Sequence, residues 1–114
     1  MGWIGVDLDG TLAEYHEWVG VSHIGKPIPK MVARVKKHLE NGETVKILTA
    51  RVSKNQDREK IVQAEYWIQK WCMEHLGEKL EVTCEKDFEM DILYDDRCVQ
   101  IIKNTGERAD GKED

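Results

Sequence analysis

The stretch that decides the fold is Trp3-Ile4-Gly5-Val6 followed by Asp7-Leu8-Asp9-Gly10-Thr11-Leu12. Its first four residues are apolar or small, and they predict a short buried strand that ends at Asp7. Gly10 then allows the backbone to turn tightly. In an open parallel sheet, ligands bind outside the carboxyl ends of the strands, so the polar residues that follow this strand become candidates for a site.

Outward from this stretch, strands and helices alternate. We predict helices from Pro27 and Pro29 to Leu39 and from about Asp57 to Leu76, strands over 44–48, 80–84 and 92–94, and a short fifth strand over 99–102. This order favours an α/β fold with a mostly parallel sheet flanked by helices. The link over residues 85–91 is short, since a parallel crossover usually takes about a dozen residues. Either it crosses in extended form, or one adjoining strand is misassigned or antiparallel.

With 114 residues, the chain has the length of one small domain. We expect this domain to span residues 1–103, with residues 13–26 as a short flap beside the site. Residues 104–114 are charged and poor in apolar side chains, which favours a flexible tail.

Charge and composition exclude several partners. The chain has 17 basic and 22 acidic residues, a net charge of −5, so non-specific nucleic-acid binding is disfavoured. No apolar run reaches the length of a membrane span, and we expect no signal peptide because the first residues lack a basic stretch followed by an apolar one. The 3 cysteines are an odd number and widely spaced, which favours the reducing cytoplasm over a disulfide framework.

Polar side chains follow each of the main predicted strands. The first strand ends at Asp7, the second at Thr49 and the fourth at Asp95-Asp96, while Lys86 follows the third. Turn residues are polar in general, but this explanation does not account for carboxylates, a hydroxyl and an ammonium group meeting at one edge. We therefore expect them to form a site.

That set suits metal-assisted phosphoryl transfer. A carboxylate such as Asp7 can act as a nucleophile and form an aspartyl-phosphate. A divalent cation between Asp7 and the Asp95-Asp96 pair would offset their charge, and an all-oxygen set favours Mg²⁺. Asp9 would act as general acid and then as general base. Thr49 and Lys86 would contact the phosphoryl oxygens.

These residues carry a resemblance to the haloacid dehalogenase (HAD) superfamily. Asp7-Leu8-Asp9-Gly10-Thr11-Leu12 resembles its first motif, DxDGT. Thr49, Lys86 and the pair Asp95-Asp96 are similar to its second, third and fourth motifs, in family order, over about residues 3–102. The resemblance implies a Rossmann-like core and a Mg²⁺-dependent phosphohydrolase.

By the family pattern, Asp7 is the nucleophile and Asp9 the acid/base, which also lends its backbone carbonyl to the metal. Asp95 is then the more direct metal ligand of its pair. The implied sheet places the second and the last strand on either side of the first. The full set of site residues that we expect is catalytic Asp7 and Asp9; substrate- or phosphate-binding Gly10, Thr49, Ala50, Arg51 and Lys86; and metal-binding Asp7, Asp9, Asp95 and Asp96.

The gaps between motifs are filled by the core helices, so the chain resembles a capless member of the family. Its open site would admit a phosphorylated small molecule or a macromolecular end, or a second copy of the chain would close it as a homo-oligomer. Tyr15 and Trp18 of the flap are candidates for stacking on a ligand, and Arg51 for binding an anion.

Two other classes of function remain open from the sequence. A receiver-type phosphoacceptor module also gathers aspartates, a threonine and a lysine on one edge, but its acidic pair comes first in the chain. A non-catalytic phosphate-binding or scaffold protein is the other alternative. Activity on a panel of phosphomonoesters separates both from a phosphatase.

Overall fold

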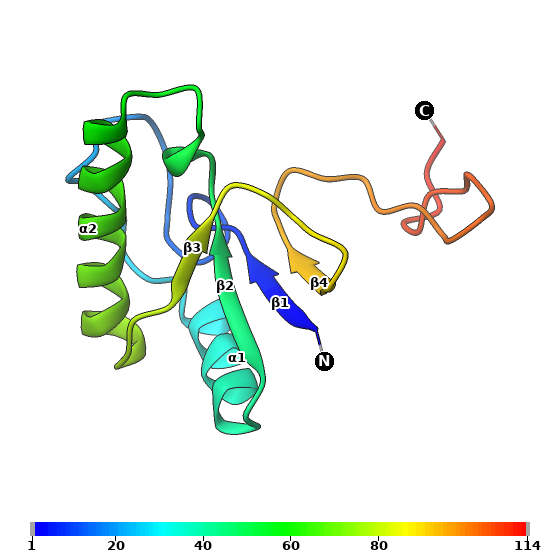
Figure 1. The fold of residues 1–114 in the computed structure, drawn as a ribbon. Coiled ribbons are helices and arrows are strands. Elements are labelled where there is room, and N and C mark those ends of the chain that lie inside the picture. The colour runs from blue at the N-terminus through cyan, green and yellow to red at the C-terminus, as the bar shows by residue number, and fades with distance from the viewer. Residues whose placement is uncertain (1, 114) are drawn as a thin grey trace.

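The computed structural model describes residues 2–113. In them, four strands form one parallel sheet, and two long helices pack beside it (Figure 1). The strands are β1 (Trp3–Val6), β2 (Thr44–Leu48), β3 (Glu81–Thr83) and β4 (Met90–Tyr94). The helices are α1 (Pro29–Glu40) and α2 (Arg58–Leu76), and a 3-10 turn η1 (Ala50–Val52) follows β2. The strand order is β3-β2-β1-β4 with every pair parallel. The fold is therefore the α/β, Rossmann-like one expected, with β2 and β4 on either side of β1.

Both long helices bury an apolar stripe against one core. Pro29 occupies the start of α1, where its missing N–H costs nothing, and Met31 and Val35 face inward. The longer α2 buries residues such as Ile68 and Cys72, and it ends at Gly77, whose φ of 83° is the left-handed geometry of a helix end. The other residues of this core include Ile4, Val6, Leu8, Leu12, Val45 and Ile47.

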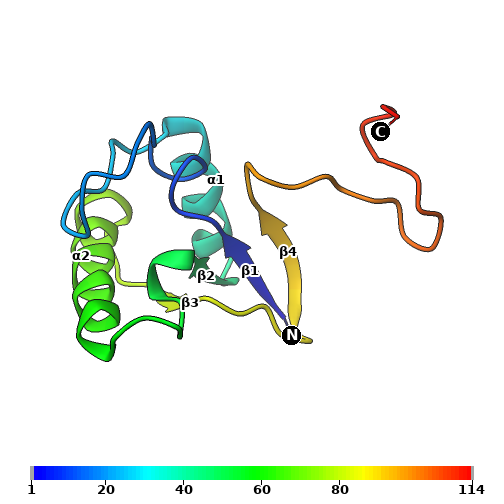
Figure 2. The same ribbon diagram turned by 90° about the horizontal axis from the view of Figure 1, so that it is seen from above.

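The link from β3 to β4 crosses the sheet in extended form, without a helix, which decides between the two alternatives left open by the sequence. It runs on the side of the sheet away from α1 (Figure 2). The Trp3 indole Nε1 donates a hydrogen bond to Asp87 Oδ1 at 2.8 Å, and the Trp3 backbone N–H donates to the Glu89 carbonyl at 3.0 Å. Lys46 Nζ lies 4.6 Å from the centroid of the Trp3 ring. A thin layer of side chains thus covers this face, and the link passes close to the start of β1.

The predicted fifth strand over 99–102 is wrong. Among the described residues no strand follows β4, and Ile101 forms only an isolated bridge with Arg108. Val99, Ile101 and Ile102 stay about half exposed, so no core contact fixes them in a sheet. This segment extends away from the sheet (Figure 1).

The flap is a closed loop. Ala13 bridges Pro27 at its base, and Glu14 N–H donates to the Lys26 carbonyl at 2.8 Å. The Trp71 indole of α2 donates to the Gly25 carbonyl at 3.0 Å. The residues between these contacts contain no helix or strand, but the loop is anchored at its base and by α2.

No described helix is both long and apolar enough to cross a lipid bilayer. The 3 cysteines are unpaired. Cys72 is buried in the core, and burial raises the pKa of its thiol to about 11.

Candidate functional site

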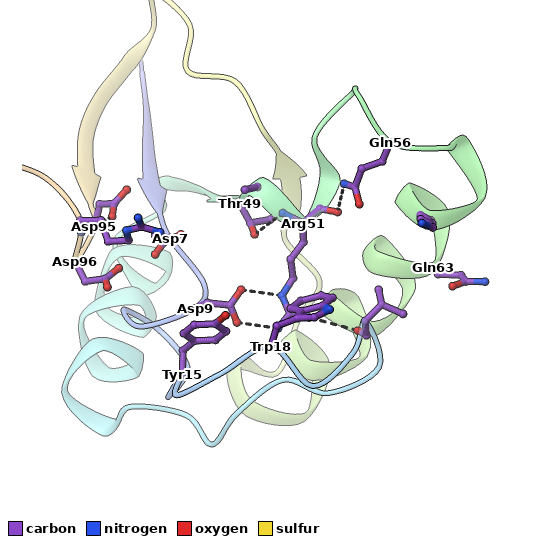
Figure 3. Close-up of a pocket in the computed structure, with 14 residues that line it drawn as sticks. Asp7, Asp9, Tyr15, Trp18, Thr49, Arg51, Gln56, Gln63, Asp95 and Asp96 are labelled. Atoms are coloured by element: carbon purple, nitrogen blue, oxygen red, sulfur yellow. Dashed lines mark hydrogen bonds and ion pairs between the residues drawn. The ribbon is translucent and has the colours of Figure 1, made fainter.

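A cavity of about 940 Å³ opens at the carboxyl edge of the sheet. It forms there because β1, β2 and β4 are parallel, so Asp7, Thr49 and Asp95, which follow these strands, reach the same edge. The cavity is lined by most of the predicted site residues, namely Asp7, Asp9, Thr49, Ala50, Arg51, Asp95 and Asp96. Figure 3 shows Asp7, Asp95 and Asp96 at one end of this cavity, Asp9 and Arg51 between, and Gln56 and Gln63 at the other end.

Three carboxylates form the acidic end. One oxygen from each of Asp7, Asp95 and Asp96 lies within 4.8 Å of the others. The Thr11 hydroxyl lies 3.3 Å from Asp7 Oδ2 and 3.1 Å from Asp96 Oδ1, and it accepts a hydrogen bond from the Asp96 N–H at 3.0 Å. Because a hydroxyl has one proton, Thr11 serves one of these carboxylates at a time and does not balance their charge.

This crowding changes the titration of Asp7. Burial, a hydrogen bond with Asp96 and repulsion from Asp95 and Asp96 raise the pKa of Asp7 from 3.8 to about 7, against a smaller opposing effect of the Thr11 hydroxyl. A cation among the three carboxylates would remove this repulsion. Hard carboxylate oxygens at this spacing, with no sulfur or imidazole ligand, fit Mg²⁺.

Asp9 turns away from the acidic cluster and pairs with Arg51. Arg51 Nε and Nη2 donate to Asp9 Oδ2 and Oδ1, each at 2.8 Å, which is a bidentate ion pair. Arg51 Nη2 also donates to the His23 carbonyl at 3.0 Å, and its guanidinium lies 4.8 Å from the centroid of the Trp18 ring. The sequence led us to expect Arg51 to bind an anion directly. In the structure its guanidinium group binds the Asp9 carboxylate and the His23 carbonyl of the flap.

Thr49 is positioned by the turn that follows β2. It is 4% exposed and precedes η1, and its Oγ1 accepts a hydrogen bond from the Arg51 N–H at 3.1 Å. Its backbone N–H donates to the Thr83 carbonyl at the end of β3. Since the hydroxyl accepts in this contact, its own proton remains for donation to an oxyanion in the cavity.

Gly10 does not line the cavity but permits its geometry. Its φ is +88°, and a Cβ built on it would lie 2.6 Å from Asp96 Oδ2. A side chain at this position would therefore push Asp96 away from Asp7. Gly10 acts on the acidic cluster rather than on a phosphate.

Lys86, like Gly10, is a predicted site residue that does not line the cavity. It lies in the extended link, next to Asp87, whose carboxylate binds the indole of Trp3 at the start of β1. The link leaves the carboxyl edge of the sheet directly after β3 and crosses toward the start of β4. The sequence does not predict the route of this link, because residues 85–91 have no apolar periodicity that would distinguish one route across the sheet from another.

Four polar residues of the cavity wall escaped the sequence analysis: Gln56, Lys60, Gln63 and Arg97. Lys60 and Gln63 are three residues apart at the start of α2, so they lie on one helix face. This helix begins beside the carboxyl edge, and its first turn could have been searched for ligand-binding residues on that ground. Arg97, which directly follows the acidic pair, also contributes to the wall of the cavity.

No protein-family model and no curated protein matches this sequence. Among solved structures, a conserved protein from Bacteroides thetaiotaomicron is similar, with a TM-score of 0.58 and 20% sequence identity. The match covers 99% of this chain and 82% of that chain. At this identity the likeness bears on the fold alone, and it agrees with the Rossmann-like arrangement of β1 to β4.

Proposed function

We propose that this protein is a Mg²⁺-dependent phosphatase of the HAD type, which hydrolyses a phosphomonoester through an aspartyl-phosphate on Asp7. The observation that carries the proposal is the convergence of Asp7, Thr49 and the Asp95-Asp96 pair on one cavity. These residues come from three separate parts of the chain. They match the roles of nucleophile, phosphate donor and metal ligand that the motif resemblance implies.

In the first step, an Asp7 carboxylate oxygen attacks the phosphorus, and the bond from phosphorus to the leaving oxygen breaks. Asp9 acts here in its protonated state, with one oxygen on Arg51 and the proton on the other; it gives this proton to the leaving oxygen, which departs as an alcohol. In the second step, a water oxygen attacks the phosphorus and Asp9 takes its proton. The bond between phosphorus and Asp7 then breaks and releases inorganic phosphate, so Asp7 and Asp9 return to their starting states.

The remaining residues orient and bind. Thr49 donates its hydroxyl proton to a phosphoryl oxygen, and the following Ala50 lines the cavity beside it. Asp7, Asp95, Asp96 and the backbone carbonyl of Asp9 would hold Mg²⁺. When bound, the cation offsets the negative charge of the carboxylates and of the phosphoryl oxygens. Arg51 fixes the Asp9 carboxylate through both of its oxygens.

The test is hydrolysis of p-nitrophenyl phosphate by the wild type and by Asp7→Asn, each with Mg²⁺ and with EDTA. We expect turnover only in the wild type with Mg²⁺. Asp91→Asn is the matched control, because it makes the same change on β4 outside the acidic cluster and should retain turnover. Turnover of Asp7→Asn at the wild-type rate would exclude the aspartyl-phosphate route.

The same experiment separates the alternatives. A phosphoacceptor module would yield a stable phosphorylated protein, visible by intact mass after treatment with acetyl phosphate, and no sustained release of phosphate. A scaffold protein would show neither.

A further inference from the structure

The cavity extends well beyond the acidic cluster. Its volume of about 940 Å³ is that of a site for a complete small molecule rather than for a phosphate alone. Trp18 of the flap borders the cavity beside Arg51, side chains at the start of α2 border its far end, and Tyr15 of the flap lies on the side of Asp9 (Figure 3). Trp18, Tyr15 and the α2 side chains have no role in the proposed phosphoryl transfer.

The Trp18 side chain is exposed, and the Arg51 guanidinium packs against its ring. It is 57% exposed, yet the Arg51 guanidinium lies over it at 4.8 Å from the ring centroid. Arg51 in turn is fixed by Asp9 and by the His23 carbonyl, and its side chain is 6% exposed. Core packing therefore does not account for Trp18. A rigid indole with one side on a guanidinium retains surface for a second flat group.

The far end of the cavity has hydrogen-bonding groups of both kinds. The Gln56 amide Nε2 donates to the Arg51 carbonyl at 2.9 Å and to the Ser53 carbonyl at 3.3 Å, so Gln56 offers its carboxamide oxygen as an acceptor. Gln63 offers a carboxamide that both donates and accepts, and Lys60 adds an ammonium group. Among the described lining residues, the carboxylates are confined to Asp7, Asp9 and the Asp95-Asp96 pair. The far end thus suits an uncharged polar edge such as that of a nucleobase.

We infer that this cavity binds a nucleoside monophosphate, whose base stacks on Trp18 and whose edge faces Gln56 and Gln63, with its phosphate at Asp7. The inference rests on the proposed function and narrows its substrate class. A single nucleotide fits better than a nucleic acid strand, because the net charge of −5 offers no basic track for a polyanion.

The test compares AMP with ribose 5-phosphate, which differs from AMP only by lacking the base. Binding of both is measured by calorimetry on Asp7→Asn with Mg²⁺, where hydrolysis does not interfere. Weaker phosphate binding in this variant affects both ligands alike, so their ratio reports on the base. We expect AMP to bind about 5- to 150-fold more tightly, which corresponds to the roughly 1–3 kcal/mol that one stacked base contributes.

Trp18 is then tested in the same background. Trp18→Ala should reduce the ratio to near one, while Trp18→Phe, which keeps a ring, should retain most of it. Tyr66→Ala is the matched control, since Tyr66 is an exposed aromatic residue of α2 outside the cavity wall, and it should leave the ratio unchanged. Circular dichroism verifies that each variant is folded.

The outcomes separate this inference from the proposed function. Hydrolysis of p-nitrophenyl phosphate by the wild type together with equal binding of AMP and ribose 5-phosphate would overturn the nucleotide site and leave the phosphatase standing. Tighter, Trp18-dependent binding of AMP without any hydrolysis would support the nucleotide site and overturn the phosphatase. A preference for AMP that survives in Trp18→Ala would refute the stacking, and absence of binding and hydrolysis would overturn both.

Discussion

Replacement of Asp7 by Asn should stabilise the protein in the absence of metal, although it removes the proposed nucleophile. The reason lies in the three carboxylate oxygens of Asp7, Asp95 and Asp96 within 4.8 Å of one another. The amide of Asn has nearly the same shape as the carboxylate but no charge. It therefore removes repulsion from the folded state at any pH where Asp7 would be ionised.

The size of the effect follows from the pKa of Asp7. A rise from 3.8 to about 7 corresponds to about 4 kcal/mol between the two protonation states. Because solvent reaches part of this carboxylate and screens it, we expect about 1–2 kcal/mol. A raised pKa means that the folded protein binds the proton more tightly than the unfolded chain. Wild-type stability therefore decreases as the pH rises from about 4 to about 7.

The assay is urea denaturation of the wild type and Asp7→Asn at pH 4.5 and pH 8, with EDTA. Other carboxyl groups titrate in this range too, but they cancel in the difference between the two proteins. At pH 8 we expect Asp7→Asn to be about 1–2 kcal/mol more stable, and at pH 4.5 the difference should be about half as large, because the folded wild type then retains the proton on Asp7.

Two further results complete this test. The control Asp91→Asn should change stability by less than about 0.5 kcal/mol at both pH values, since Asp91 lies outside the cluster. Millimolar Mg²⁺ should stabilise the wild type at pH 8 and reduce its deficit relative to Asp7→Asn. A variant that is less stable than the wild type at pH 8, or equally shifted at both pH values, would refute uncompensated repulsion at Asp7.

Three other predictions concern turnover with Mg²⁺, each measured by steady-state kinetics. Asp9→Asn should slow hydrolysis of an alkyl phosphate about 10²- to 10⁴-fold and affect p-nitrophenyl phosphate less, because p-nitrophenolate leaves without a proton; equal losses would speak against Asp9 as the acid. Arg51→Ala should lower kcat more than it raises KM, and Arg51→Lys should restore little, since an ammonium lacks the bidentate fork that orients Asp9. A change confined to KM would instead indicate direct binding of substrate by Arg51. Thr49→Val should lower kcat/KM more than Lys86→Ala does, because Thr49 lines the cavity and Lys86 does not; the reverse order would mean that the link over 84–89 reaches the site.

Much of the fold could be predicted because local pattern and tertiary packing agree there. The apolar run before Asp7 becomes β1, and the two apolar stripes become α1 and α2, since each buries the face that its periodicity indicates. The segment over 99–102 has the composition of a strand, but it pairs only through an isolated bridge between Ile101 and Arg108 and not with the sheet. Strand propensity reflects packing on a half-buried surface, and without that surface it does not create a strand.

The candidate site divides in the same way. Asp7, Thr49 and the Asp95-Asp96 pair could be predicted because each directly follows a strand, and the parallel sheet alone brings strand ends together. The partners of Arg51 could not be predicted. They depend on how the flap folds back over the cavity, and irregular segments have no periodicity from which a contact can be inferred. The same holds for Lys86, whose position depends on the path of an irregular link.

Arg51 connects the two halves of the proposed site. One side of its guanidinium group supports the Trp18 ring, and its edge holds both oxygens of Asp9. A base that stacks on Trp18 would press the ring against the guanidinium and so restrain the carboxyl group that must meet the leaving oxygen. Binding of a part of the substrate that does not react would then be used to orient the group that does, which raises kcat rather than only lowering KM. For this reason the nucleotide preference should be larger in kcat/KM on the wild type than in binding to Asp7→Asn.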